Sequence, residues 1–177
     1  PLRLEQLIER DIPSGMNIRS KEINETDEAL SLVDAIRCSC GRRDYNALSV
    51  GTLGGGNHFI ELDEDDERNI YLVIHSGSRN LGKKVCDFYQ KKAEKERYYA
   101  GQGVVAELIA RLKAEGRARD IQKELQNLPR QFGQRDPLAY LEGQSFLDYI
   151  HDMELCQKFA ELNRRAMVRV ILEGDRK

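Results

Sequence analysis

Residues 51–61 read GTLGGGNHFIE, and HSGSRNLG follows at residues 75–82. In the first stretch, three consecutive glycines come directly before an amide and an imidazole. A plain strand does not favour three glycines in a row, because glycine loses more backbone freedom on folding than other residues. Such a run favours a tight loop whose backbone approaches a ligand closely, often a phosphate held by converging N–H groups. A bulge or a tight turn without a ligand is the alternative.

The two stretches flank the most strand-like part of the chain. Residues 57–63 and 69–75 are rich in apolar side chains, and the acidic link EDDER joins them. This pattern predicts a β-hairpin. If the hairpin is symmetric about the Asp66–Glu67 bond, His58 lies directly opposite His75, with roughly 4.5–5.5 Å between the two Cβ atoms. Both imidazoles are then expected on one face of the sheet, above Ile60 and Val73.

The rest of the chain is expected to be mainly helical. Apolar residues recur at helical spacing in four segments: 2–10, 26–37, 104–126 and about 138–172. We therefore expect an α+β fold, with a hairpin-containing sheet in the first half and a mostly helical second half. The predicted parts are an α/β region at residues 1–82 that carries both motifs, a charged helical insert at 83–137, and a long helix at 138–177 that packs back on the core.

Composition indicates a globular chain without a strong overall charge. Of 177 residues, 40% are apolar and 33% charged, with a formal net charge of −2. No apolar run approaches the ~18 residues of a membrane span, so we expect no membrane contact and a cytoplasmic location. Cys38, Cys40, Cys86 and Cys156 lack the spacing of a zinc knuckle or a disulfide framework, and we expect reduced thiols. The chain does not begin with Met, and we expect it to be a piece of a longer protein.

Two of the three histidines stand at the ends of the predicted hairpin. Imidazole binds Mn, Zn, Fe and Ni, so His58 and His75 beside a glycine loop indicate a metal site. A catalytic metal normally has at least three protein ligands, and these two histidines alone make an incomplete site. The alternative is that both are ordinary core or surface histidines. His151 is expected at the surface of the long helix.

The second motif has the features of an anion site at a strand-to-helix turn. Arg79 offers a planar fork suited to phosphate, and the N-terminus of the following helix favours an anion. A solvated turn is the alternative. Residues 111–135 carry seven Lys and Arg against three Asp and Glu. This bias permits phosphate contact, but a charge-rich solvated helix is the favoured explanation.

Taken in order, the two motifs closely resemble the RtcB family of RNA-splicing ligases. The helix pattern DM..CQ.FA..NR..M, from Asp152 to Met167, resembles the same family, and the resemblance covers essentially the whole chain. It implies a ligase dependent on GTP and manganese that joins RNA 3′-phosphate or 2′,3′-cyclic phosphate ends to 5′-hydroxyl ends through a guanylylated histidine. The implied partners are GTP and RNA, either tRNA halves in tRNA splicing or broken ends in RNA repair.

The resemblance also assigns roles to individual residues. Five consecutive residues match a nucleotide-binding segment: Asn57, His58, Phe59, Ile60 and Glu61. Within this segment Asn57 is expected at the GTP phosphates and Glu61 at the guanine edge. His58 matches a ligand of one manganese ion and His75 a ligand of a second. Arg79 is expected to contact RNA phosphate.

The chain departs from the family pattern in several places. Nothing matches the upstream Asp-Ile-Gly-Cys-Gly-type motif that supplies a metal-bridging cysteine, and CSCG at residues 38–41 has a different context. Asn80 stands where the family usually has glycine. The guanylylated histidine and a further histidine ligand belong beyond the long helix. We therefore expect a central fragment without a catalytic residue of its own, inactive alone and weak in metal binding. A non-catalytic RNA- or nucleotide-binding module and a metal-dependent phosphoesterase are the alternatives.

Overall fold

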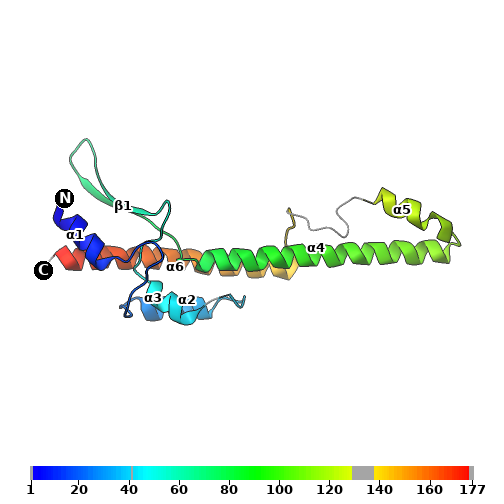
Figure 1. Cartoon of the computed structure of the whole chain (residues 1–177), viewed down its shortest axis with the longest axis horizontal. Coiled ribbons are helices and arrows are strands. Elements are labelled where there is room, and N and C mark those ends of the chain that lie inside the picture. Colours follow the sequence, from blue (N-terminus) through cyan, green and yellow to red (C-terminus); the bar gives the residue numbers. More distant parts are fainter. Residues whose placement is uncertain (1, 41, 129–137, 176–177) are drawn as a thin grey trace. The chain divides into compact units, whose positions relative to one another are not determined.

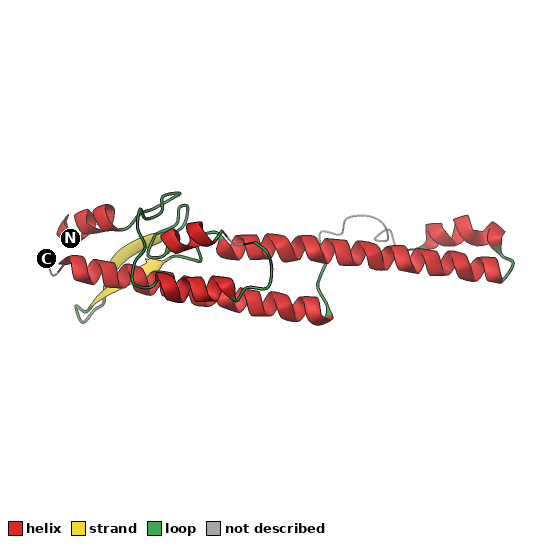
Figure 2. Cartoon of the chain, turned by 90° about the horizontal axis from the view of Figure 1, so that it is seen from below, coloured by secondary structure: helices red, strands yellow, loops and turns green. Residues whose placement is uncertain are grey.

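The computed structural model of the chain describes residues 2–40, 42–128 and 138–175, which form helices and one β-hairpin (Figure 1). The elements are α1 (Leu2–Asp11), α2 (Thr26–Asp34), α3 (Arg43–Ser49), β1 (Phe59–Glu64), β2 (Ile70–His75), α4 (Leu81–Ala114), the 3-10 helix η1 (Ala118–Asp120), α5 (Ile121–Asn127) and α6 (Gly143–Asp175). The α+β class is confirmed, because a two-stranded hairpin early in the chain is followed by long helices. Figure 2 shows the strands and the helices in separate colours.

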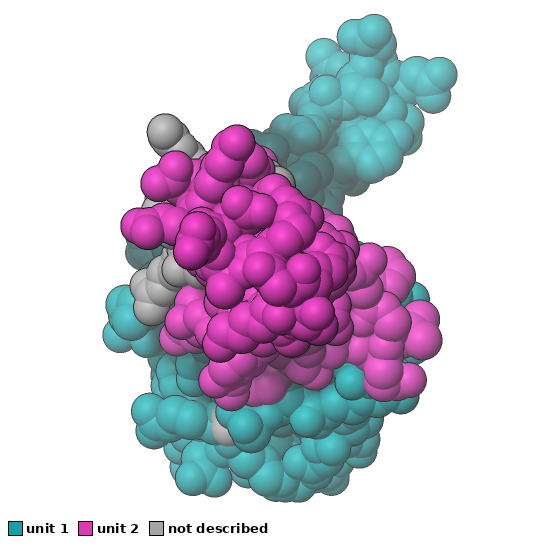
Figure 3. All heavy atoms as spheres, turned by 90° about the vertical axis from the view of Figure 1, so that its right-hand side faces the viewer, with its two compact units in different colours: residues 1–86, 148–177 teal, residues 87–147 magenta. Residues whose placement is uncertain are grey.

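The chain divides into two compact units (Figure 3). Unit 1 comprises residues 1–86 and 148–177, and unit 2 comprises residues 87–147. Both motifs lie in unit 1. The three-part division predicted from the sequence stays a prediction.

Unit 1 is built around a small apolar core under the hairpin. Leu7 and Ile12, near the N-terminus, and Met167 and Ile171 of α6 form a buried cluster. Three side chains from one face of the hairpin pack against it: Ile60, Leu72 and Ile74. The hairpin is therefore anchored by one face only, and the other face is left for polar and aromatic side chains.

The register of the hairpin differs by one residue from the prediction. Phe59, and not His58, lies opposite His75, and Ile60 pairs with Ile74. Ile60 and Val73 consequently lie on opposite faces of the sheet. The prediction of a directly opposed histidine pair was wrong, because His58 precedes the first residue of β1.

The cause of the shift is the turn, which is centred on Glu67 and not on the Asp66–Glu67 bond. The N–H of Arg68 bonds to the carbonyl of Asp65, and the Asp65 carboxylate accepts the N–H groups of Glu67 and Asn69. Arg68 has a φ of 66°. A type I turn followed by one left-handed residue is the usual three-residue hairpin loop. Such a loop shifts every cross-strand pair by one position relative to the symmetric arrangement.

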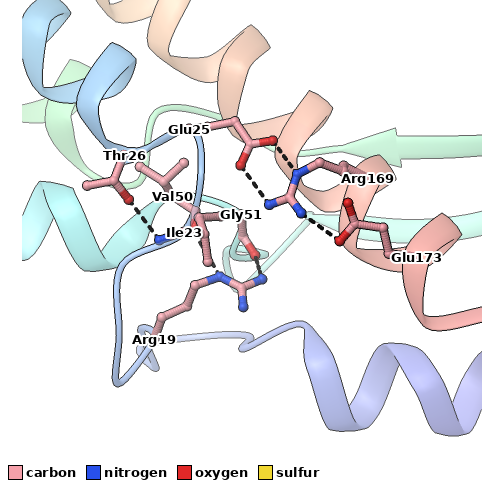
Figure 4. A network of polar contacts seen from close by, with 8 residues as sticks. All are labelled: Arg19, Ile23, Glu25, Thr26, Val50, Gly51, Arg169 and Glu173. Carbon is pink, nitrogen blue, oxygen red and sulfur yellow. Dashed lines mark hydrogen bonds and ion pairs between the residues drawn. The ribbon is translucent and has the colours of Figure 1, made fainter. Parts of the chain in front are cut away.

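Polar contacts also fix the loop that leads into the glycine stretch (Figure 4). Arg19 donates from Nε to the carbonyl of Val50 at 3.0 Å and from Nη2 to the carbonyl of Gly51 at 2.7 Å. Gly51 has a φ of 69°, and a Cβ atom there would lie 2.8 Å from Cδ1 of Ile23. Beside this loop, Arg169 of α6 forms a two-pronged ion pair with Glu25. The backbone at the start of the glycine stretch is therefore held in place by Arg19.

Unit 2 is helical and carries several charged contacts. Arg117 pairs with Asp120 at 2.8 Å and with Glu124 at 3.5 Å, which ties η1 to α5. The guanidinium of Arg97 lies over the ring of Tyr140, 4.4 Å from its centroid. None of the helices within the described ranges has the length and apolar character needed to cross a membrane.

Candidate metal and nucleotide site

The imidazole of His58 lies in a slot between two glycines. A Cβ atom on Gly54 would overlap the ring, at 2.9 Å from Cγ and closer still to Nδ1. On the other side, a Cβ atom on Gly77 would lie 3.8 Å from Nε2. Gly54 thus has a steric reason, since any side chain at position 54 would occupy the place of the imidazole.

The structure brings the two histidines together even though they are not a cross-strand pair. The ring centroids of His58 and His75 lie 5.8 Å apart, with 51° between the ring planes. The ring of Phe59 stacks on the ring of His75, with 5.3 Å between the centroids and nearly parallel planes. His58 is half-buried and His75 is exposed.

The surroundings of His58 favour its neutral form. Burial lowers the pKa of His58, and positive charge on His75 and on Arg79 lowers it further. The Nδ1 atom is buried and has no hydrogen-bond partner within the described part of the chain. Metal ions bind the neutral imidazole, so a neutral ring with an unpartnered nitrogen beside a second imidazole fits a pair of metal ligands.

These two histidines do not complete a coordination shell. Among the residues that the structure describes, no group of three or more His, Cys, Asp or Glu side chains could hold a metal ion. All four cysteines are free thiols. Burial raises the pKa of Cys38, and burial raises the pKa of Cys156 to about 12. Because the thiolate is the metal-binding form, these two buried thiols are poor ligands.

The proposed nucleotide segment has two sides. Phe59 and Glu61 are exposed and lie on the same face of the sheet as His75, since alternate residues of a strand point the same way. Ile60 points to the opposite face and packs against the core cluster. Asn57 is exposed in the loop before β1. The side chains of Asn57, Phe59 and Glu61 are therefore accessible, and that of Ile60 has a packing role.

Arg79 has a structural role in this conformation, because its side chain holds a loop through two backbone carbonyls. Its side chain is buried, with 7% exposed, and Nη2 donates to the carbonyls of Gly15 at 2.8 Å and Asn17 at 3.2 Å. Its Nε atom is buried without a hydrogen-bond partner in the described segments. The expected contact with RNA phosphate stays a prediction. The next residue, Asn80, has a φ of 72°, a conformation usual for glycine that asparagine tolerates better than most residues.

Two further polar residues lie at the site, and the sequence alone did not assign them to it. Asn163 of α6 is fully buried and bonds to the backbone of Thr52 and Gly77. Its neighbour Arg164 donates to the carbonyl of Ser76 at 2.9 Å. The signal was present in the pattern DM..CQ.FA..NR..M, where polar Asn163 interrupts an otherwise apolar helical stripe. His151 lies outside this group, with Nδ1 3.0 Å from Oδ1 of Asp152.

A family model and several known proteins are similar to this chain. A family model described as tRNA-splicing ligase RtcB matches residues 3–175. The RNA-splicing ligase RtcB of Escherichia coli K12 is 32% identical over 124 residues, covering 70% of this chain and 24% of that protein. The tRNA-splicing ligase RtcB of Aeropyrum pernix is 35% identical over 83 residues, covering 39% of this chain and 17% of that protein.

The match to these relatives is partial in length. The chain spans about a quarter of the Escherichia coli relative. No solved structure matches the chain at a significant level. The family model, in contrast, covers nearly every residue, including both histidines and the α6 pattern. This chain belongs to the RtcB family.

Proposed function

We propose that this chain supplies part of the active site of an RNA ligase that depends on GTP and manganese. The ligase joins RNA 3′-phosphate or 2′,3′-cyclic phosphate ends to 5′-hydroxyl ends, in the cytoplasm, where RNA and GTP are found. The observation that carries the proposal is the His58–His75 pair, with ring centroids 5.8 Å apart. Family membership narrows the chemistry to ligation.

In this proposal His58 and His75 each give one ligand to manganese. Two cations, when bound, would neutralise charge on the attacking and leaving phosphate oxygens. The slot formed by Gly54 and Gly77 orients the His58 ring, and Phe59 restrains His75 by stacking. The low pKa of His58 keeps its ring neutral and ready to bind near neutral pH.

The exposed face of the hairpin provides the nucleotide contacts. In this proposal Glu61, which is exposed on this face, accepts hydrogen bonds from the N–H groups at the edge of guanine, and a carboxylate is an acceptor-only group that selects donors. Asn57, at the end of the glycine loop, offers its side-chain amide to the phosphates. The nucleotidyl-accepting histidine is assigned to a part of the ligase beyond the long helix, as the family resemblance implies.

The three histidines permit a matched test. In the longer ligase with radiolabelled GTP and Mn²⁺, we expect His58→Ala and His75→Ala to abolish covalent guanylylation and ligation. The control His151→Ala should leave both intact. Unchanged guanylylation and ligation in His58→Ala would contradict the ligand role. Phosphate release from RNA 3′ ends without GTP would indicate a phosphoesterase, and salt-sensitive RNA binding that ignores Mn²⁺ would indicate a binding module.

A further inference from the structure

Asn163 bonds to the glycine loop at Thr52 and to Gly77, in the two segments whose glycines pack around His58. Its Oδ1 accepts the N–H of Thr52 at 3.1 Å, and Thr52 lies two residues before Gly54. Its Nδ2 donates to the carbonyl of Thr52 at 3.1 Å and to the carbonyl of Gly77 at 3.1 Å. One side chain thus joins the glycine loop to the turn of the second motif at the place where the imidazole lies between them.

These bonds leave Asn163 with little freedom. The side chain is fully buried, as is Thr52, and the amide uses its acceptor and its donors. Thr52 lies between α3 and β1, so Asn163 supplies the backbone pairing that a neighbouring strand would otherwise provide. Because an unsatisfied buried backbone group is costly, the slot is expected to rearrange if the amide is removed.

A second contact from α6 reinforces the same turn. Arg164 donates from Nη1 to the carbonyl of Ser76 at 2.9 Å, and Nδ2 of Asn163 lies 3.4 Å from Oγ of Ser76. The position of the turn that carries Gly77 therefore depends on α6. The glycine loop depends on α6 as well, through the bonds between Thr52 and Asn163.

We propose that Asn163 is a positioning residue of the two-histidine site, which acts through Thr52 and Gly77 to set the slot that orients His58 toward His75. The inference rests on the proposed role of these histidines as metal ligands. Asn163 itself contacts neither histidine in this arrangement. It differs from a general anchor because its partners, Thr52 and Gly77, belong to the two segments whose glycines pack around His58.

Asp152 provides a matched control on the same helix. It is equally buried, with none of its surface exposed, and it accepts the N–H groups of Arg37 at 2.8 Å and Cys38 at 3.0 Å. Its partners lie in a loop that carries no site residue. Asn163→Ser and Asp152→Ser therefore place the same side chain on one helix. The first removes the anchor of the glycine loop and of the Gly77 turn, and the second removes the anchor of the loop at Arg37 and Cys38.

The direct readout is the nuclear Overhauser effect between the His58 ring protons and the Gly77 α protons, which the slot geometry brings close. The His58 signals are assigned by their loss in His58→Ala. We expect the effect in the wild type and in Asp152→Ser, and its loss in Asn163→Ser. Asn163→Asp, which keeps the acceptor for Thr52 but loses both donors, should lose it too and serves if Asn163→Ser fails to fold. Retention in the Asn163 variants, or equal loss in Asp152→Ser, would overturn the proposal.

Calorimetric titration of the same variants with Mn²⁺ separates this inference from the proposed function. We expect at least tenfold weaker binding in Asn163→Ser and less than a twofold change in Asp152→Ser. If the wild type and His58→Ala bind Mn²⁺ equally, the ligand role fails, and the Overhauser effect alone decides whether Asn163 sets the slot. If His58→Ala weakens binding and Asn163→Ser does not, the positioning role is wrong and the ligand role stands.

Discussion

Phe59 lies directly opposite His75 in the hairpin, and their rings stack with centroids 5.3 Å apart and 18° between planes. The pairing that the sequence suggested for His58 is therefore taken by an aromatic residue. His58 approaches His75 from the end of the strand, and Phe59 approaches it from across the ladder. The position of His75 thus depends on a residue that the family resemblance places in the nucleotide segment.

Removing this aromatic partner should release His75. In Phe59→Ala we expect a loss of about 1 kcal/mol in unfolding free energy, a typical value for an aromatic pair. The His75 ring protons, shifted upfield by stacking, should move downfield in the proton NMR spectrum. Leu62→Ala, on the same strand but the opposite face, is the control and should leave those shifts unchanged. Unchanged His75 shifts in Phe59→Ala would show that the stacking does not persist in solution.

Position 54 should tolerate no side chain. A Cβ atom in Gly54→Ala would overlap the His58 ring, so the ring or the loop must move, at a cost of about 1–3 kcal/mol in unfolding free energy. Gly55→Ala is the control, because its Cβ atom would meet only Cα of Gly15, at 3.4 Å. Urea unfolding measures both. Equal stability of the two variants would mean that the slot is wider than described.

The ion pair between Glu25 and Arg169 should make stability depend on acidic pH. The hydrogen bond from Arg169 lowers the pKa of Glu25 below its usual value. Because the folded-state pKa is the lower one, this stabilisation is present above the unfolded pKa of about 4.3 and is lost as the pH falls through the folded value. In Glu25→Gln we expect a loss of up to about 1 kcal/mol at pH 7, with a flatter profile between pH 3 and 5.

Urea unfolding at a series of pH values measures this profile. Glu173→Gln is the control, because Glu173 also pairs with Arg169 but its side chain is 55% exposed. The control should cost less than Glu25→Gln. A profile for Glu25→Gln that parallels the wild type below pH 5 would contradict the assignment.

The cysteines should react at very different rates. Cys86 is exposed, whereas Cys156 is buried with a pKa raised to about 12. At pH 8 only about one Cys156 thiol in ten thousand is then ionised, and the thiolate is the reactive form. Mass spectrometry after iodoacetamide treatment should find Cys86 alkylated first and Cys156 only after unfolding. Equal rates in the native protein would show that α6 opens readily around Cys156.

The sequence predicted the helical character of most segments, but not the exact bounds of the helices. The helical segment expected at residues 104–126 is not one element. α4 runs unbroken from Leu81 to Ala114, Gly116 follows with a φ of 69°, and α5 begins at Ile121. The sequence indicated no helix at residues 43–49, where the short helix α3 packs against α2, and so short a helix depends on such packing.

The sequence predicted that His58 and His75 lie close together, but not the geometry that brings them together. The motifs identified His58 and His75, whereas the register depended on Arg68 adopting a left-handed conformation that its sequence does not favour. Asn163 could not be connected to the site from sequence alone, because its partner Gly77 lies 86 residues earlier. Helical and strand periodicities predict which residues of one element are neighbours. They do not predict which residues of different elements come into contact.

The anchoring of early loops by a late helix has a consequence for how the protein is made. Glu25, Thr52 and Gly77 leave the ribosome before the α6 residues that hold them, and the shortest interval is the 86 residues between Gly77 and Asn163. At about 5–20 residues per second, translation takes roughly 4–17 s to cover that interval. During this time the nascent chain carries both histidines without the contacts from Asn163 that hold their loops. The arrangement of His58 and His75 seen in unit 1 is therefore held in place only near the end of synthesis of this segment.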